Sequence, residues 1–176
     1  TRSTGRPDGR LRRLQAEADR LALAAGAQAV EGPGLRVTLD DSPLSLGDPA
    51  LPEDTRPDDL VVHQHDLQAV VNALWVGGAE AVQLMDQRVI ATSAVRCVGP
   101  VLILQGRVYP PPYVVTAIGP VGRMRASLER SPGVATYRDY VALVGLRYDV
   151  EDARAVTVPA YDGPLELVHA RAGAPG

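Results

Sequence analysis

The segment 65–78 reads His65-Asp66-Leu67-Gln68-Ala69-Val70-Val71-Asn72-Ala73-Leu74-Trp75-Val76-Gly77-Gly78, and its apolar residues follow a helical period. One stripe has members at i, i+3, i+4, i+7 and i+8, namely Leu67, Val70, Val71, Leu74 and Trp75. At about 100° per residue they cover an arc of about 140°, wide enough to lie on a sheet. Asp66 suits the helix start, and Gly77-Gly78 suits its end, because glycine readily adopts the left-handed conformation. The pattern predicts a central helix with the only tryptophan on its buried face.

The composition indicates one globular domain with appendages. Of the 176 residues 45% are hydrophobic, but phenylalanine is absent and only 4% are aromatic. Such a core must rest on Val, Leu, Ile and Ala, which suits helices packed on a sheet. The net charge of −3 argues against nucleic-acid binding, since phosphate neutralisation needs a basic surface. There is no run of eighteen apolar residues, so no segment of the chain is predicted to cross a bilayer.

A short coiled-coil-like helix is predicted ahead of the globular domain. Residues 1–9 are polar and we expect them to be disordered, whereas residues 10–31 read as a coiled-coil or linker helix that ends at Gly32-Pro33-Gly34. The helix carries an a/d heptad seam of Leu11, Leu14, Ala18, Leu21 and Ala25. It is either a solvated helix packed on its own domain or the end of a longer coiled coil. Because the chain begins at Thr1, we expect it to be a fragment of a longer protein.

Residues 32–162 have the pattern of an α+β domain. Strands that meet at Asp86-Gln87 and at Gln105-Gly106 read as hairpins, and the helices are separated from the strands along the chain. Further strands are expected at 35–39, 94–98, 113–118 and 146–150, with 156–158 as the continuation or the partner of the last, and further helices at 120–130 and 132–144. We therefore predict a mainly antiparallel or mixed sheet with helices packed on it, with ferredoxin-like packing the nearest arrangement.

Two segments are predicted to be flexible. Residues 40–60 are rich in proline and acidic side chains, and bury too little apolar surface to offset the entropy of ordering. A loop of this length is either disordered or functional. Residues 163–176 are expected to form a flexible tail.

The densest polar cluster precedes the central helix. His63, His65 and Asp66, with Asp40 and Asp41 at a strand end, have the side chains of a histidine–carboxylate metal site. The two histidines point the same way in an extended segment but not in a helix, so the sequence does not fix their geometry. The alternative is an ordinary helix start, in which Asp66 caps the helix and the histidines are solvated. We expect no resident cofactor or metal.

The sequence offers two further candidates for a functional site, a patch of polar side chains and a single cysteine. Arg88 and Arg96 on adjacent strands, with Asn72 on the central helix, could bind a small anion; otherwise they form surface pairs. Cys97 lies in an apolar strand with no histidine near it in sequence, which favours a buried structural thiol over a nucleophile. The chain has no GxSxG, SxxK, HExxH or GxGxxG motif, and we expect no enzymatic activity.

The order of several motifs resembles a known bacterial family. Asp66–Trp75 leads into Gly78–Val82, and Gln87–Ile90, Ser93–Gly99, Pro111–Gly119 and Val156–Tyr161 follow. Over residues 32–162 these motifs resemble the YlxW-like family, domain of unknown function 881, of Gram-positive bacteria and Actinobacteria. Asp86-Gln87 stands where an Asn-Gly turn is more usual in the family.

The resemblance implies a membrane helix N-terminal to this chain, then a coiled coil and a globular head outside the cytoplasm. Family members often lie near cell-division and envelope genes, so an envelope or division role is implied by association alone. The family has no established catalytic residues to carry over. The first hypothesis is a membrane-anchored, non-enzymatic scaffold that self-associates through its N-terminal helix or binds protein partners. The alternative is a ligand- or metal-binding regulatory head with its site near the start of the central helix.

Overall fold

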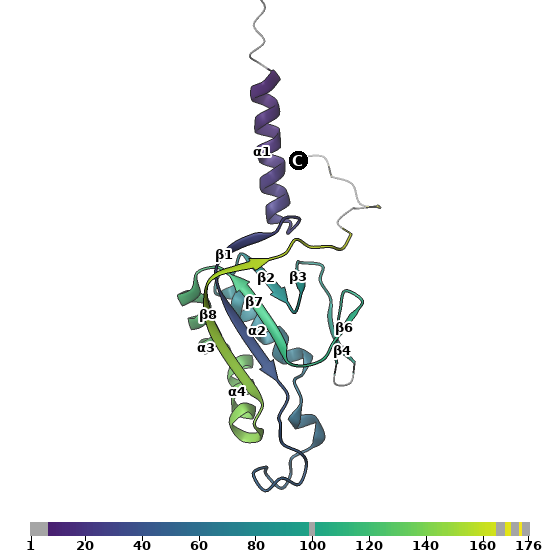
Figure 1. Ribbon diagram of the computed structural model, residues 1–176, viewed down its shortest axis with the longest axis vertical. Helices are drawn as coiled ribbons and strands as arrows, with labels where there is room; N and C mark the ends of the chain where they lie inside the picture. The colour runs from purple at the N-terminus through teal and green to yellow at the C-terminus, as the bar shows by residue number, and fades with distance from the viewer. Residues whose placement is uncertain (1–6, 99–100, 165–167, 170–172, 174–176) are drawn as a thin grey trace, which may run out of the picture.

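A five-stranded antiparallel sheet is the centre of the fold in the computed structural model, which describes residues 7–98, 101–164, 168, 169 and 173 (Figure 1). Its strands are β1 (Val30–Asp40), β2 (Ala81–Leu84), β3 (Gln87–Val89), β7 (Tyr113–Ile118) and β8 (Arg147–Val158). They lie side by side in the order β3-β2-β7-β1-β8. The longest ladder joins β1 to β8, so strands from the two ends of the domain pair with each other.

Three helices cover one face of this sheet (Figure 1). They are α2 (Gln64–Val76), α3 (Val121–Arg130) and α4 (Pro132–Val144). The chain therefore runs β1–α2–β2 and then β7–α3–α4–β8, and the four strands of these units lie in the order β2-β7-β1-β8. This interleaving of two strand–helix–strand units is the ferredoxin-like arrangement. The prediction of an α+β fold with this tendency is confirmed.

A small sheet is inserted between β3 and β7. It consists of β4 (Val95–Val98), β5 (Val101–Leu104) and β6 (Arg107–Tyr109) in that order. Gln105 and Gly106 both have positive φ, at 51° and 79°, as a two-residue hairpin requires. Leu102 and Leu104 of β5 are fully buried in the main core, so this sheet is part of the same domain.

The first hairpin is displaced by one residue from its predicted position. Gln87 pairs with Leu84 at the end of the β2–β3 ladder, so the turn consists of Met85 and Asp86 rather than Asp86-Gln87. Met85 takes the positive φ of 56° that this turn requires. The sequence lacked the glycine that normally marks such a position, which explains the error in register.

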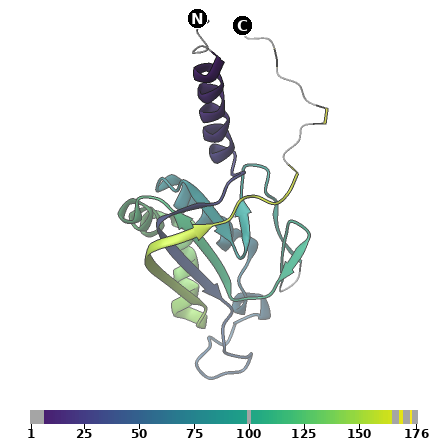
Figure 2. The same cartoon turned by 45° about the horizontal axis from the view of Figure 1, so that its top comes forward.

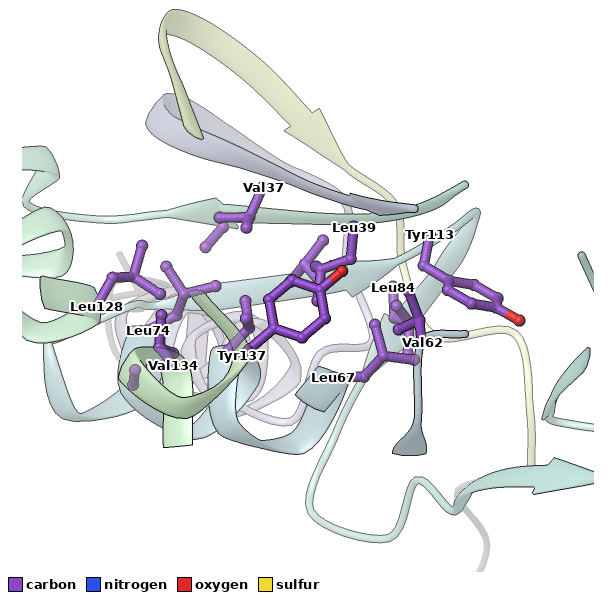
Figure 3. Packing of buried hydrophobic residues seen from close by; sticks show 14 of the residues in the cluster. Val37, Leu39, Val62, Leu67, Leu74, Leu84, Tyr113, Leu128, Val134 and Tyr137 are labelled. Carbon is purple, nitrogen blue, oxygen red and sulfur yellow. The ribbon is translucent and has the colours of Figure 1, made fainter. Parts of the chain in front are cut away.

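The core lies between the sheet and α2 (Figure 3). Leu35, Val37 and Leu39 point from β1 toward the helices and are fully buried, as alternation along a strand predicts. Leu67 and Leu74 of α2 are also fully buried. Each such side chain contributes about 1.5–3 kcal/mol by leaving water.

The buried face of α2 is rotated from the one predicted. Trp75 is 39% exposed, so its predicted place in the core is wrong. The helix instead turns small residues inward at four-residue spacing, with Ala73 buried and Gly77 against the backbone of α3. Ala69 lies so close to α4 that a Cβ on Gly133 would sit 2.7 Å from the Ala69 Cβ. Close approach of two neighbouring helices therefore sets the orientation of α2 more than the width of its large apolar stripe does.

The N-terminal helix α1 (Pro7–Ala24) projects from the head as an arm (Figures 1 and 2). Its seam residues Leu11, Leu14 and Leu21 are 57%, 54% and 63% exposed, which contradicts packing against its own domain. No helix among the described residues is long and apolar enough to cross a membrane. The expected disorder of residues 1–9 falls largely outside the described residues, which begin at Pro7 with the helix itself.

The helix ends earlier than predicted. It stops at Ala24, and Gly32-Pro33-Gly34 lies inside β1, where the ladder to β8 shifts register. A bulge accommodates proline in a strand because it needs no ladder donor there. At the other end of the chain most of the predicted tail 163–176 lies outside the described residues.

The acidic segment 40–60 is attached to the domain near both its ends. The Ser42 N–H donates to the Leu60 carbonyl over 2.9 Å, and the Val62 N–H donates to Asp41 Oδ1 over 2.8 Å. The segment also contains a 3₁₀ turn, η1 (Pro57–Leu60), which is rigidified by a hydrogen bond from the Arg56 N–H to Asp59. The flexibility of the rest of the segment stays a prediction.

Candidate functional site

A histidine–carboxylate cluster lies where η1 meets the start of α2. His63 is the N-cap residue of α2 in extended conformation, and its backbone N–H donates to Asp66 Oδ2 over 2.8 Å. The two residues form a capping box, so Asp66 caps the helix from its third position rather than from its first. The sequence presented helix capping and a histidine–carboxylate cluster as alternatives. In the structure the Asp66 carboxylate takes part in both.

The two imidazole rings are stacked. Their centroids are 5.2 Å apart and the ring planes differ by 17°. His63 is still extended while His65 is in the first turn of the helix, and this change of backbone brings both rings to the same side. His65 Nε2 lies 3.2 Å from Asp66 Oδ1, and His63 Nδ1 lies 3.8 Å from Asp66 Oδ2. One ligand atom from each of the three residues lies within 4.8 Å of the others.

The cluster opens into a cavity of about 270 Å³ between η1, α2 and α4. Asp58 of η1 enters this site, and its Oδ1 lies 3.2 Å from His63 Nε2. That nitrogen is buried and has no hydrogen bond of good geometry. Asp58 was not singled out from the sequence, because its segment carried no periodic pattern; Pro57 followed by two acidic residues was the available sign of a turn. Tyr140 and Leu146 also line the cavity.

Burial is the main influence on the pKa values of the carboxylates at this site. Desolvation raises the pKa of Asp66 above its ordinary value of 3.8, against the lowering effects of the His63 backbone hydrogen bond and of the two histidine charges. The pKa of Asp41, beside Val62, is also raised, chiefly by desolvation. The fold therefore holds negative charge in a partly dehydrated site beside two imidazoles.

Asp66→Asn is expected to gain stability relative to the wild-type chain as the pH rises. A carboxyl with a raised folded-state pKa contributes stability that is full below its unfolded pKa and is lost as pH rises through its folded pKa. The asparagine oxygen still accepts the His63 N–H and does not titrate. Urea unfolding of both proteins at about pH 4 and about pH 7, with chelator present, measures the change. Asp54→Asn, which removes an exposed carboxylate, controls for net charge. An equal gain in both variants would contradict the burial argument.

The three residues of the second candidate patch have different surroundings. Arg88 is buried, and its Nη1 donates to the carbonyl oxygens of Gln28 and Pro159 over 3.4 Å and 3.1 Å. Desolvation lowers its pKa. Asn72 and Arg96 are exposed, and no described hydrogen bond or ion pair links either to Arg88. Arg88 therefore ties the start of β1 to the end of β8, a role that no local sequence signal indicates.

Cys97 has the features of a structural thiol. It is half-buried and free, and its backbone N–H donates to the Gln64 side chain over 3.2 Å. Burial, and then the charge of Asp66, raise the pKa of the thiol. A raised pKa reduces the thiolate fraction, so these surroundings do not activate a nucleophile.

Fold and site together define a head-and-arm protein: an α+β domain of ferredoxin-like strand order, a histidine–carboxylate cluster at its central helix, and a projecting N-terminal helix. The chain belongs to the family described as "Bacterial protein of unknown function (DUF881)", which matches residues 17–171. The resemblance to the YlxW-like family is therefore confirmed.

Several curated relatives carry the name UPF0749. The chain is 32% identical over 155 residues to UPF0749 protein Rv1823 of Mycobacterium tuberculosis, covering 87% of the chain and 50% of the relative. It is 32% identical over 165 residues to Rv1825 of the same species, covering 92% and 50%. It is 31% identical over 118 residues to YlxW of Bacillus subtilis, covering 67% and 48%. The chain thus spans about half the length of these relatives.

A solved structure shares the fold. The crystal structure of an uncharacterized conserved protein from Mycobacterium tuberculosis superposes with a TM-score of 0.66 at 28% identity, covering 89% of this chain and 99% of that one. The family and relatives carry names of unknown function rather than names of enzymes.

Proposed function

We propose that this chain is the head and adjoining arm of a non-enzymatic scaffold of the bacterial cell envelope, which self-associates through α1. The exposed leucines of α1 support this, because a seam of large apolar side chains on an isolated helix is stable only when a partner covers it. A second copy of the same helix offers a matching seam. The chain matches only about half the length of the relatives, so we propose that the full-length protein has a longer arm.

The envelope location and the association with cell division belong to the same proposal. They follow from the family resemblance: a membrane segment elsewhere in the full-length protein would anchor the arm, with the head outside the cytoplasm. The start of β1 and the end of β8 lie next to α1, and the acidic segment 40–60 lies at the opposite end of the head (Figures 1 and 2). An anchored head would therefore present its acidic segment away from the membrane. Cell fractionation with protease treatment of intact spheroplasts tests this part; a head that is protected from protease would refute it.

Leu14→Glu combined with Leu21→Glu is expected to abolish self-association of the chain. The two carboxylates fall on the seam and would be buried without partners in an oligomer. Sedimentation velocity over a wide range of protein concentration, with chemical crosslinking, gives the measurement. Because alanines occupy part of the seam and the arm is short, the association is expected to be weak.

Leu23→Glu is the matched control, because Leu23 is 45% exposed on the same helix but lies outside the seam. It should leave the association intact. If the wild-type chain, and any longer native form of the protein, sediment as strict monomers at all concentrations, self-association through α1 is wrong. Equal effects of the seam and control variants would also argue against the seam.

A ligand- or metal-binding head remains the second candidate. The clustering of His63, His65 and Asp66 beside a cavity favours a binding site at the start of α2 over one at Asn72, Arg88 and Arg96. Metal binding is compatible with a scaffold, since a metal can order a surface without catalysing a reaction.

A further inference from the structure

Two separations between donor atoms at the start of α2 are close to those in a tetrahedral metal site. Zinc–nitrogen and zinc–oxygen bonds of about 2.0–2.2 Å place neighbouring ligand atoms about 3.4 Å apart. Asp66 Oδ1 and His65 Nε2 are 3.2 Å apart, and Asp66 Oδ2 and His63 Nδ1 are 3.8 Å apart. One ligand atom from each of the three residues lies within 4.8 Å of the others, so side-chain rotation without a change of backbone can bring all three onto one cation.

The capping hydrogen bond fixes the Asp66 carboxylate. The two stacked imidazoles start close together, and their rings must tilt toward each other so that one cation can lie in both ring planes. His63 can bind a metal through Nδ1, and its Nε2 lies 3.2 Å from Asp58 Oδ1, so a rotation of the Asp58 side chain would make the hydrogen bond that the present geometry lacks. A carboxylate behind a ligating histidine orients the ring and raises its basicity. Asp58 thus completes a histidine–carboxylate pair from a different element, η1.

We propose that His63, His65 and Asp66 bind a borderline divalent transition-metal cation, with Zn²⁺ as the expected metal and Asp58 as the residue that orients His63. Two imidazoles and a carboxylate favour zinc over the hard cations Ca²⁺ and Mg²⁺, which prefer oxygen ligands alone. The adjoining cavity leaves room for a water molecule or a partner's side chain at the fourth position. A cation here would offset the two carboxylates and fasten η1 to α2. The proposal does not depend on self-association of α1.

The test uses the tag-free 176-residue chain and titrates it with Zn²⁺ by calorimetry and with Co²⁺ by absorbance. We expect one ion per chain, and visible Co²⁺ bands of the intensity typical of tetrahedral coordination. Ca²⁺ and Mg²⁺ should not compete. His65→Ala should weaken binding by at least about tenfold, and Asp58→Asn by about 10–100-fold. The His65 side chain is 74% exposed, so its removal should not unfold the domain, and circular dichroism verifies this.

His169→Ala is the matched control, since His169 is an exposed histidine far along the chain from the cluster. It should bind both metals like the wild-type chain. The proposal is overturned if the wild-type chain binds neither metal below the millimolar range. It is also overturned if His65→Ala binds as tightly as wild type, or if His169→Ala loses as much affinity as His65→Ala.

Discussion

Leu74→Ala is expected to lower the free energy of unfolding of the domain by about 3 kcal/mol, within the range of about 2–5 kcal/mol typical of leucine truncation in a core. Leu74 is fully buried on α2 in the main core cluster, beneath the sheet (Figure 3). Its removal leaves a void that close-packed neighbours from two layers fill only in part. Urea unfolding followed by circular dichroism measures the loss as a lower midpoint with an unchanged slope.

Val76→Ala is the control for this prediction, because Val76 is on the same helix but 84% exposed. Its effect should stay within about 0.5 kcal/mol, as for other surface substitutions. If both variants lost equal stability, the orientation of α2 described above would be wrong. Leu74 lies on both the predicted stripe and the observed buried face, so the pair of variants compares a buried with an exposed position of one helix.

Gly34→Ala is expected to destabilise the domain by about 3 kcal/mol or more. A Cβ at this position would lie 2.1 Å from the Ala117 carbonyl oxygen and 3.0 Å from Val156 Cγ2. The first contact is with the backbone of β7, and Gly34 also pairs with β8, so neither neighbouring strand can move away without breaking its ladder. Thermal and urea unfolding should both show the loss.

Gly122→Ala serves as the matched substitution. A Cβ there meets no atom within 4 Å, and the residue lies in the first turn of α3. Alanine should leave stability unchanged or raise it by up to about 1 kcal/mol, because alanine loses less conformational freedom in a helix. A loss in this variant comparable to that of Gly34→Ala would remove the steric explanation.

Elements with a complete local signal were predictable from the sequence. The second hairpin has Gly106 at its turn, α4 ends at Gly145 with a φ of 78°, and the strand 113–118 has its predicted bounds. Of the two alternatives for residues 156–158, continuation of the strand at 146–150 is the right one, since both segments belong to β8. In each case neighbouring residues decide the conformation through turn geometry, capping or alternation.

Features that depend on distant partners were not predictable. Trp75 was misplaced because the contacts of Ala69 and Gly77 with α4 and α3 rotate the helix. The buried Arg88 bonds carbonyls 60 and 71 residues away in sequence, which no spacing rule reveals. For the candidate site, His63, His65 and Asp66 were identifiable from composition, but Asp58 and the cavity required the folded path of η1.

The position of β1 determines how the head responds to a pull on its arm. Tension along α1 enters the domain through β1, which is hydrogen-bonded on both sides, to β7 and to β8. Next to the arm, residues 30–32 of β1 pair with β8 alone, and from Gly34 onward the strand is paired with both β7 and β8. Arg88 and a hydrogen bond from the Tyr161 N–H to the Gly26 carbonyl brace the entry point. The arm is thus joined to the inside of the sheet rather than to an edge strand, so displacing β1 would disrupt the ladders on both of its sides.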